Sequence, residues 1–152
     1  MTIRILSVGK KHDQALSAAI DEYSVRTARI IKLDWEFVPP SGLPEQQARL
    51  DESERLLQRV REDIVWLLDE RGVQVDSPAL STKLTDLQIK GVKQLTIVIG
   101  GAYGVSKRMH ERADFTWSLS KLVFPHQLVR LILAEQLYRA TEIARGSGYH
   151  HV

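Results

Sequence analysis

Apolar residues follow two different periods that alternate along the chain. The runs "IRILSVG" (3–9) and "QLTIVIGG" (94–101) are continuous, rich in β-branched residues and closed by glycine, which is typical of buried strands. The segment "KLDWEFVPP" (32–40) alternates apolar with charged residues until two prolines stop it, and "DIVWLLDERG" (63–72) contains a strand expected at the centre of a sheet. Helices are predicted between the strands, over residues 13–30, 45–61, 77–91 and 106–113, the third capped by Ser77-Pro78.

This alternation predicts an α/β fold, with a mostly parallel sheet covered by helices on both faces. The 152 residues are most simply one domain, residues 1–152. Ligands of such sheets bind beyond the carboxyl ends of the strands. The loops expected to gather there are "LDERG", "GGAYGVS" and "SLSKLVFPHQ".

The final helical stretch, "KLVFPHQLVRLILAEQLYRATEIARG" (121–146), is apolar around most of its circumference yet carries Arg130, Glu135, Arg139 and Arg145. A helix of this kind is buried on more than one side. A single small domain rarely provides that much cover, so the pattern predicts a homodimer or an unusual chain path.

Composition limits the classes of protein. The chain has no cysteine, which excludes a disulfide framework, a thiol nucleophile and a cysteine-ligated zinc site. No apolar run is long enough for a membrane span, and the start lacks a secretory signal, so a cytoplasmic location is expected. Residues 77–152 hold ten Lys and Arg against five Asp and Glu, which suggests either a polyanionic partner such as RNA or an ordinary solvated surface.

Three glycines follow the strongest strand signal, in "IVIGGAYGVS". Glycine there allows a ligand to approach the backbone and permits positive φ. The order Gly100, Gly101, Gly104 is not the dinucleotide fingerprint, and Gly104-Val105-Ser106-Lys107 excludes a P-loop. A cofactor site and a tight turn without a ligand both remain open on this feature.

Several strings together resemble one family. "SVGK", "EY", "L-D-x-x-G", "IGGxxG", "SLSKLVFPHQLVR", "AEQLYRA" and a terminal "YH" occur in order and at matching spacing. The chain resembles the ribosomal RNA large subunit methyltransferase H family of the SPOUT superfamily, over nearly its full length. The resemblance implies a trefoil knot within about residues 94–150 and a homodimer. It also implies S-adenosylmethionine-dependent methylation of N3 of a pseudouridine in the 23S rRNA of assembled ribosomes.

The resemblance also assigns cofactor-binding residues. These are Leu68, Gly100 with Gly101 beside it, and the segment Leu119, Ser120, Lys121, Leu122, Val123, Phe124. Loop backbone groups of this kind can bind the edge of adenine while Leu68, Leu122 and Phe124 contact its face. For Phe124, core packing is an equally good interpretation.

Methylation of an imide nitrogen requires loss of its proton, and three residues are candidate bases. His126 follows Pro125 and could instead cap the last helix, while Glu135 could simply pair with Arg139 four residues on. His150 lies in a tail that ends in His151-Val152, where relatives have a basic residue. Water or hydroxide could also remove the proton, so the sequence leaves the base open.

Arg130, Arg139 and Lys121 are candidates for phosphate contacts, and Tyr149 and His150 for other contacts with RNA; Tyr138 could stack on a base or pack in a dimer interface. No metal is expected, because the histidines do not form a ligand set. A function of another class, a non-catalytic RNA- or nucleotide-binding α/β module, would not need the segment 119–124 with Gly100. Binding of S-adenosylmethionine separates the two.

Overall fold

A computed structural model describes residues 1–60 and 62–151, and it contains five strands and five helices in these described parts. The strands are β1 (Thr2–Val8), β2 (Lys32–Val38), β3 (Ile64–Gln74), β4 (Gln94–Ile99) and β5 (Phe115–Ser118). The helices are α1 (Gln14–Ala28), α2 (Glu45–Arg59), α3 (Ser77–Ile89), α4 (Lys107–Arg112) and α5 (His126–Ala144). The expected helix end at Arg61 and the terminal Val152 lie outside the described residues.

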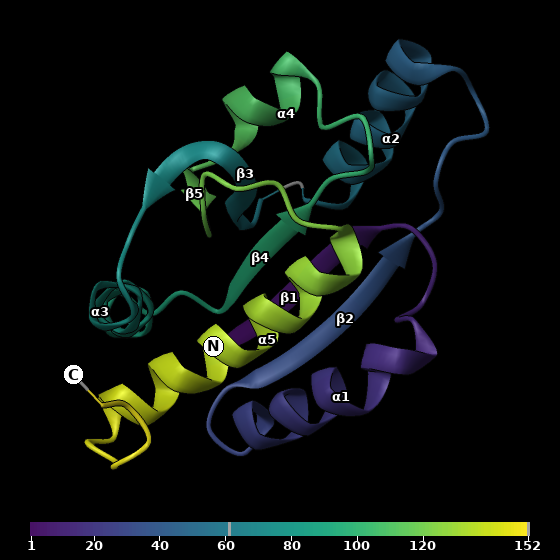
Figure 1. The fold of residues 1–152 in the computed structure, drawn as a ribbon. Coiled ribbons are helices and arrows are strands. Elements are labelled where there is room, and N and C mark those ends of the chain that lie inside the picture. The colour runs from purple at the N-terminus through teal and green to yellow at the C-terminus, as the bar shows by residue number, and fades with distance from the viewer. Residues whose placement is uncertain (61, 152) are drawn as a thin grey trace.

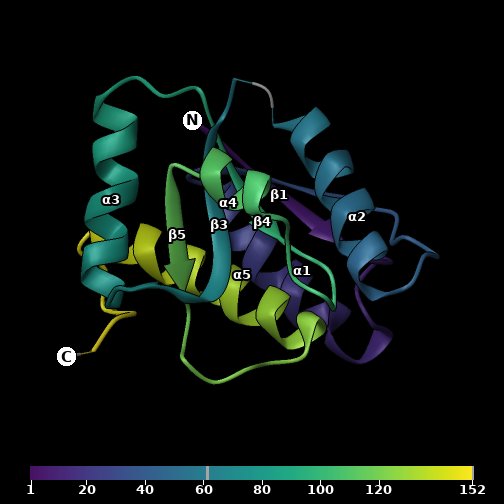
Figure 2. The same cartoon turned by 90° about the horizontal axis from the view of Figure 1, so that it is seen from above.

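The five strands form one parallel sheet in the order β2-β1-β4-β3-β5. The strand in "DIVWLLDERG" was expected at the centre, but β4 lies there and β3 is next to the edge strand β5. Helices α1 and α5 lie on one face of the sheet and α2 and α4 on the other, while α3 stands beside β5 and packs on α5 (Figures 1 and 2). The α/β architecture with helices on both faces is confirmed.

Each face of the sheet has its own apolar core, because neighbouring side chains along a strand point to opposite faces. One core joins strand residues to α3 and α5 through Leu80, Leu84, Leu133 and Leu137. The other joins the strands to α2 and α4 through Leu56 and Met109. Continuous apolar strands such as β4 result, since both faces are covered.

Strand β3 is longer than expected and irregular. Its pairing with β5 shifts between Leu68 and Val73, so the residues of "LDERG" form a bulge rather than a free loop. A Cβ on Gly72 would lie 2.5 Å from the carbonyl oxygen of Thr116, which explains the glycine at this position. The bulge directs the side chains of the segment toward the carboxyl edge of the sheet.

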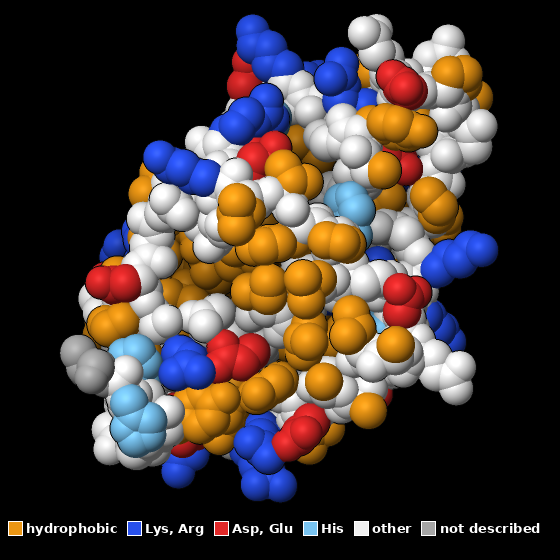
Figure 3. Space-filling view, viewed as in Figure 1, with side chains coloured by type: hydrophobic (Ala, Val, Ile, Leu, Met, Phe, Trp, Pro, Cys, Tyr) orange, Lys and Arg blue, Asp and Glu red, His pale blue; other side chains and the backbone are white. Residues whose placement is uncertain are grey.

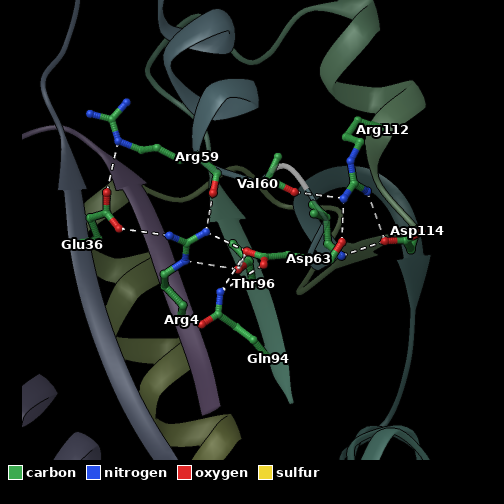
Figure 4. A network of polar contacts seen from close by, with 10 residues as sticks. Arg4, Glu36, Arg59, Val60, Asp63, Gln94, Thr96, Arg112 and Asp114 are labelled. Atoms are coloured by element: carbon green, nitrogen blue, oxygen red, sulfur yellow. Dashed lines mark hydrogen bonds and ion pairs between the residues drawn. The ribbon is translucent and has the colours of Figure 1, made fainter. Parts of the chain in front are cut away.

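A polar network links strands and helices at the opposite, amino-terminal part of the sheet (Figure 4). Arg4 donates to a carboxylate oxygen of Asp63 over 2.6 Å and to the carbonyl of Arg59 over 2.5 Å. Thr96 and Gln94 also donate to Asp63, over 2.6 and 3.0 Å. The network joins β1, β4 and the residue before β3. It lies away from the carboxyl edge of the sheet, where the loops gather.

The N-terminal cap of α3 differs from the one expected from the sequence. The cap of α3 is Asp76, whose Oδ1 accepts from the N–H of Ala79 over 2.8 Å, and Ser77 is already the first helical residue. None of the helices in the described residues is long and apolar enough to cross a membrane.

Candidate active site

A cleft of about 1490 Å³ opens at the carboxyl edge of the sheet. It is lined by segments at the ends of three neighbouring strands: residues 68–73 of the β3 bulge, residues 99–107 at the end of β4, and residues 119, 120 and 122–124 after β5. The three loops expected to gather at this edge therefore meet in one place. The volume is sufficient for a ligand the size of a nucleoside cofactor.

The glycine turn after β4 is tight as well as concave. The N–H of Gly104 donates to the carbonyl of Gly101 over 3.0 Å, and Gly104 has a φ of +76° that only glycine adopts readily. A Cβ on Gly100 would lie 2.7 Å from Cγ1 of Val105. A Cβ on Gly101 would overlap the carboxylate of Glu52 and lie 3.2 Å from Cγ1 of Val8. Gly100 and Gly101 are thus required by packing inside the protein, while both line the cleft.

The segment after β5 presents apolar side chains to solvent. Leu122 is 69% exposed and Val123 is 80% exposed, and both line the cleft with Leu119, Ser120 and Phe124. The Oγ of Ser120 accepts from the N–H of Leu122 over 3.0 Å, which fixes the bend of the loop. Exposed leucine and valine at a concave site suit a flat apolar ligand. Lys121 is exposed and lies outside the lining.

A charged cluster forms another part of the lining. Arg71 holds the carboxylate of Asp69 through its Nε, over 3.0 Å, and its Nη2, over 2.8 Å. The Nε2 of His110 lies 3.4 Å from the same carboxylate. The hydrogen bonds from Arg71 lower the pKa of Asp69 despite its burial, so Asp69 is ionised. The sequence interpretation used only Leu68 of this segment and missed all three.

Two polar atoms in the residues that line the cleft have no hydrogen-bond partner within the described parts of the chain. They are the buried Nδ1 of His126 and the buried Nε of Arg49. Burial, and then the charge of Arg130, lower the pKa of His126, and the charge of Glu52 opposes this only in part. His126 is therefore neutral at pH 7. The cap of α5 is Pro125, so the alternative of His126 as a cap is wrong.

These features fit S-adenosylmethionine. Its adenine requires apolar cover and backbone groups, which the segment 119–124 provides, and its polar amino-acid end requires hydrogen-bonding partners. Charged side chains in the lining, among them Arg49, Asp69 and Arg71, supply polar groups of that kind. Of the cofactor residues implied by the resemblance, every one except Lys121 lines the cleft.

Arg130 is not at the surface where a phosphate contact requires it. Its side chain is 1% exposed, and it donates through Nε to Oγ of Ser7 over 2.9 Å and through Nη1 to the carbonyl of Lys10 over 2.8 Å. The guanidinium also lies over the ring of Phe37, 5.0 Å from its centroid. Arg130 ties the last helix to the end of the first strand, which contradicts the expectation that it binds RNA.

The remaining candidates gather at the far end of α5. Glu135 accepts from Nε of Arg139 over 2.9 Å and from the hydroxyl of Tyr149 over 3.1 Å, and its second oxygen accepts from Gln136 over 2.7 Å. His150 lies 3.4 Å from Arg139 through Nδ1. Burial, a hydrogen bond with Tyr23 and the charge of Glu135 raise the pKa of Tyr149, so it stays protonated. We call Glu135, Arg139, Tyr149 and His150 the C-terminal cluster.

Within one chain, the C-terminal cluster does not line the cleft. Arg139 lies thirteen positions after His126 on α5, a distance of roughly 20 Å along the axis. His150 instead lines a second, smaller pocket beside α3, where Leu119 forms part of the wall of both pockets.

Of the three candidate bases, only His126 lies at the cleft. Both oxygens of Glu135 are occupied by hydrogen bonds, and its ion pair with Arg139, the plainer of the two interpretations of Glu135, is confirmed.

Comparisons with known proteins agree with this arrangement. Residues 1–150 match a family described as predicted SPOUT methyltransferase. The chain is 43% identical over 158 residues to the ribosomal RNA large subunit methyltransferase H of Acetivibrio thermocellus and 42% identical over 156 residues to that of Christiangramia forsetii. Both alignments cover 99% of each chain.

Solved structures support the same fold. A probable methylase family protein from Haemophilus influenzae superimposes with a TM-score of 0.56 at 15% identity, covering 95% of this chain and 66% of the other. The tRNA (m1G37) methyltransferase of Aquifex aeolicus gives a TM-score of 0.50 at 16% identity, covering 91% and 70%. The full-length match, the cleft at the glycine turn and the shared fold lead to one conclusion: this chain belongs to the ribosomal RNA large subunit methyltransferase H family and has the knotted α/β fold of SPOUT methyltransferases.

Proposed function

We propose that this protein is an S-adenosylmethionine-dependent methyltransferase that methylates N3 of a pseudouridine in the 23S rRNA of assembled ribosomes, in the cytoplasm. The observation that carries the proposal is the cleft at the carboxyl edge, in a chain that matches rRNA methyltransferases over its whole length. The cofactor site consists of Leu68, Gly100, Gly101 and the segment 119–124, with the knot expected within about residues 94–150.

S-adenosylmethionine supplies an electrophilic methyl group on a sulfonium. The chain contributes position and a dry environment: Leu122 and Val123 cover the apolar part of the ligand, and the glycine turn provides backbone groups close to it. His126 is the one of the three candidate bases that lines the cleft, and its lowered pKa keeps it neutral and able to accept the N3 proton.

A homodimer completes the proposed site. Hydrophobic side chains form a band across the face on which α5 lies, with Lys and Arg around its margin (Figure 3). Leu128, Leu131 and Ile132 on α5 are only half-buried in one chain. Covering them with a second copy would place two α5 helices in contact, and would allow the C-terminal cluster of one chain to approach the cleft of the other.

The RNA contacts are assigned to groups at these two places. Arg139, Tyr149 and His150 lie partly exposed in the C-terminal cluster, and the exposed Lys121 lies within the cofactor segment. Arg49 lines the cleft with no acidic partner within the described residues, which favours it for a phosphate over Arg71, already paired with Asp69.

The alternative class, a non-catalytic RNA- or nucleotide-binding module, has no need of an apolar cofactor pocket. The exposed Leu122 and Val123 beside the glycine turn favour the enzyme. The test is transfer of a radiolabelled methyl group from S-adenosylmethionine to ribosomes and to free 23S rRNA, followed by mapping of the modified nucleotide. We expect labelling of one pseudouridine in ribosomes. Cofactor binding without any transfer to either substrate would support the binding module instead.

A further inference from the structure

Helix α2 supports the glycine turn from behind with polar side chains on a face that is otherwise packed as core. Ala48 and Leu56 are 1% and 0% exposed, as expected for that face, but between them lie Glu52, 4% exposed, and Ser53, 1% exposed. Polar and charged groups in such a place cost stability unless they are fully paired. Their presence therefore requires an explanation.

Ser53 fixes the far end of the turn. Its Oγ accepts from the buried N–H of Ser106 over 2.8 Å, and Ser106 in turn caps α4 by accepting from the N–H of Met109. No other acceptor for this N–H is recorded within the described residues. The residue at which the chain leaves the cleft and enters α4 is thereby held by α2.

Glu52 packs against the near end of the glycine turn, at Gly101. Its Oε2 accepts from the N–H of Ser41 over 2.9 Å, while Oε1 is buried and has no hydrogen-bond partner in the described parts of the chain. That unpaired oxygen occupies the space that a Cβ on Gly101 would fill. Only a hydrogen fits between the turn and the carboxylate, so Gly101 and Glu52 determine each other's identity.

An unpaired buried carboxylate oxygen is a poor means of stabilising a fold, because desolvation of the charge is not offset. Such exceptions to good packing are expected where function requires them. We propose that Glu52 and Ser53 are positioning residues for the cofactor: they hold the two ends of the glycine turn in the shape that receives S-adenosylmethionine. The inference rests on the proposed placement of the cofactor in this cleft.

The variants Glu52→Gln and Ser53→Ala test the inference, with Glu54→Gln as control. Glutamine keeps the shape of Glu52 but directs an N–H donor either at the N–H of Ser41 or at Gly101. Ser53→Ala leaves the N–H of Ser106 unpaired. Glu54 is the next acid on the same helix, and within the described residues its ion pair is with the exposed Arg108. Titration calorimetry with S-adenosylmethionine gives Kd, thermal unfolding of the ligand-free protein gives Tm, and ribosome methylation gives the KM for each substrate.

We expect Ser53→Ala to raise the Kd for S-adenosylmethionine about tenfold, as for a lost hydrogen bond at a buried site. We expect a similar rise for Glu52→Gln, because an N–H donor then faces either Ser41 or Gly101 in place of a carboxylate oxygen. The KM for S-adenosylmethionine rises with the Kd, and the KM for ribosomes stays at the wild-type value. The Tm of Glu52→Gln does not fall, since the change removes a buried charge; a residue that served only stability would show the opposite pattern. Glu54→Gln matches wild type throughout.

A double-mutant cycle tests the contact itself. Gly101→Ala should weaken cofactor binding strongly in the wild-type background and less in Glu52→Ala, where the overlap with the carboxylate is gone and only the contact of 3.2 Å with Cγ1 of Val8 remains. If both Glu52→Gln and Ser53→Ala bind S-adenosylmethionine with the wild-type Kd, the roles of Glu52 and Ser53 are wrong while the proposed cofactor site stands. Failure of the wild-type chain to bind S-adenosylmethionine would overturn the proposed cofactor site together with it.

Discussion

The Nε of Arg130 donates to Oγ of Ser7 over 2.9 Å, and so joins the final helix to the first strand across 123 positions of the chain. The same guanidinium lies close to Gly9, where a Cβ would be 3.2 Å from Nη2. The φ of Gly9 is +126°, which also favours glycine. The string "SVGK" near the start and the arginine in "FPHQLVR" near the end are thus one structural unit.

Arg130→Ala should destabilise the protein by about 3 kcal/mol, because it removes a buried side chain and its hydrogen bond to the buried Ser7 hydroxyl. For a domain of this size the Tm should fall by roughly 6–12 °C. Arg108→Ala is the control, since its side chain is 71% exposed, its partner Glu54 is 49% exposed and such an ion pair contributes little. A variant with wild-type Tm that fails to bind ribosomes would restore Arg130 as an RNA contact.

Asp63 should make the fold sensitive to acid. Burial alone would raise its pKa, but the hydrogen bonds from Thr96 and Gln94 and the charge of Arg4 outweigh it and lower the pKa below the usual 3.8. A lowered carboxyl pKa contributes stability that is complete above pH 3.8 and is lost as the pH falls through the folded-state pKa.

Asp63→Asn should therefore cost about 2 kcal/mol of unfolding free energy at pH 7, and should lose less stability than wild type between pH 4 and pH 2. Urea unfolding at several pH values measures both. An acid-induced loss of stability equal in the two proteins would show that other carboxylates are responsible.

If His126 is the base, its protonation should cause the fall in kcat on the acid side of the pH–rate profile, the acid limb. Burial and the charge of Arg130 lower its pKa below 6.5, so the neutral base persists below that pH and kcat should fall only at lower values. His126→Gln should reduce kcat by about 100-fold, leave the Kd for S-adenosylmethionine within a few-fold of wild type and abolish the limb. If the limb survives in the variant, another group or water removes the proton.

The sequence was sufficient for the elements of the fold, since every expected strand and helix is present within a few residues, but not for the order of the strands, because β4 and not β3 lies at the centre. Continuous apolar runs such as "QLTIVIGG" can only be strands covered on both faces, and proline and glycine mark their ends clearly. The segments lining the cleft were also predictable, because the carboxyl ends of parallel strands meet at one edge.

Individual charged side chains were not predictable. Arg130 and Arg139 look alike in the sequence, yet one is buried against Ser7 and the other is paired with Glu135 at the surface of α5. Glu52 belongs to a helix whose composition, "DESERL", is typical of a solvated face. Only the three-dimensional packing reveals that Glu52 lies against Gly101, although its spacing of four residues from both Ala48 and Leu56 was a usable signal.

Arg139 should act on RNA rather than on the cofactor. Arg139→Ala should bind S-adenosylmethionine with near wild-type affinity but methylate ribosomes more slowly, and low salt should relieve part of the loss because the missing interaction is electrostatic. Its ion pair with Glu135 also positions Tyr149, so Tyr149→Phe, which removes only the hydroxyl contact, is the matched variant. A loss independent of salt would indicate that Arg139 serves only to order the tail.

The central claim is that one active site requires the cleft of one chain and the C-terminal cluster of another. Mixing two impaired variants tests it most directly: Leu122→Arg, which blocks the cleft at an exposed position, and Arg139→Ala, whose residual rate is the baseline. This choice avoids Gly101→Val, since a valine there would overlap Glu52 and disturb the turn itself. Subunit exchange, followed by mass spectrometry of the intact dimers, should restore methylation to about a quarter of the wild-type rate, because half of the dimers are mixed and each has one intact site. No recovery in dimers shown to have exchanged subunits would mean that each site is built within a single chain, and a monomer by light scattering at micromolar concentration would contradict the account outright.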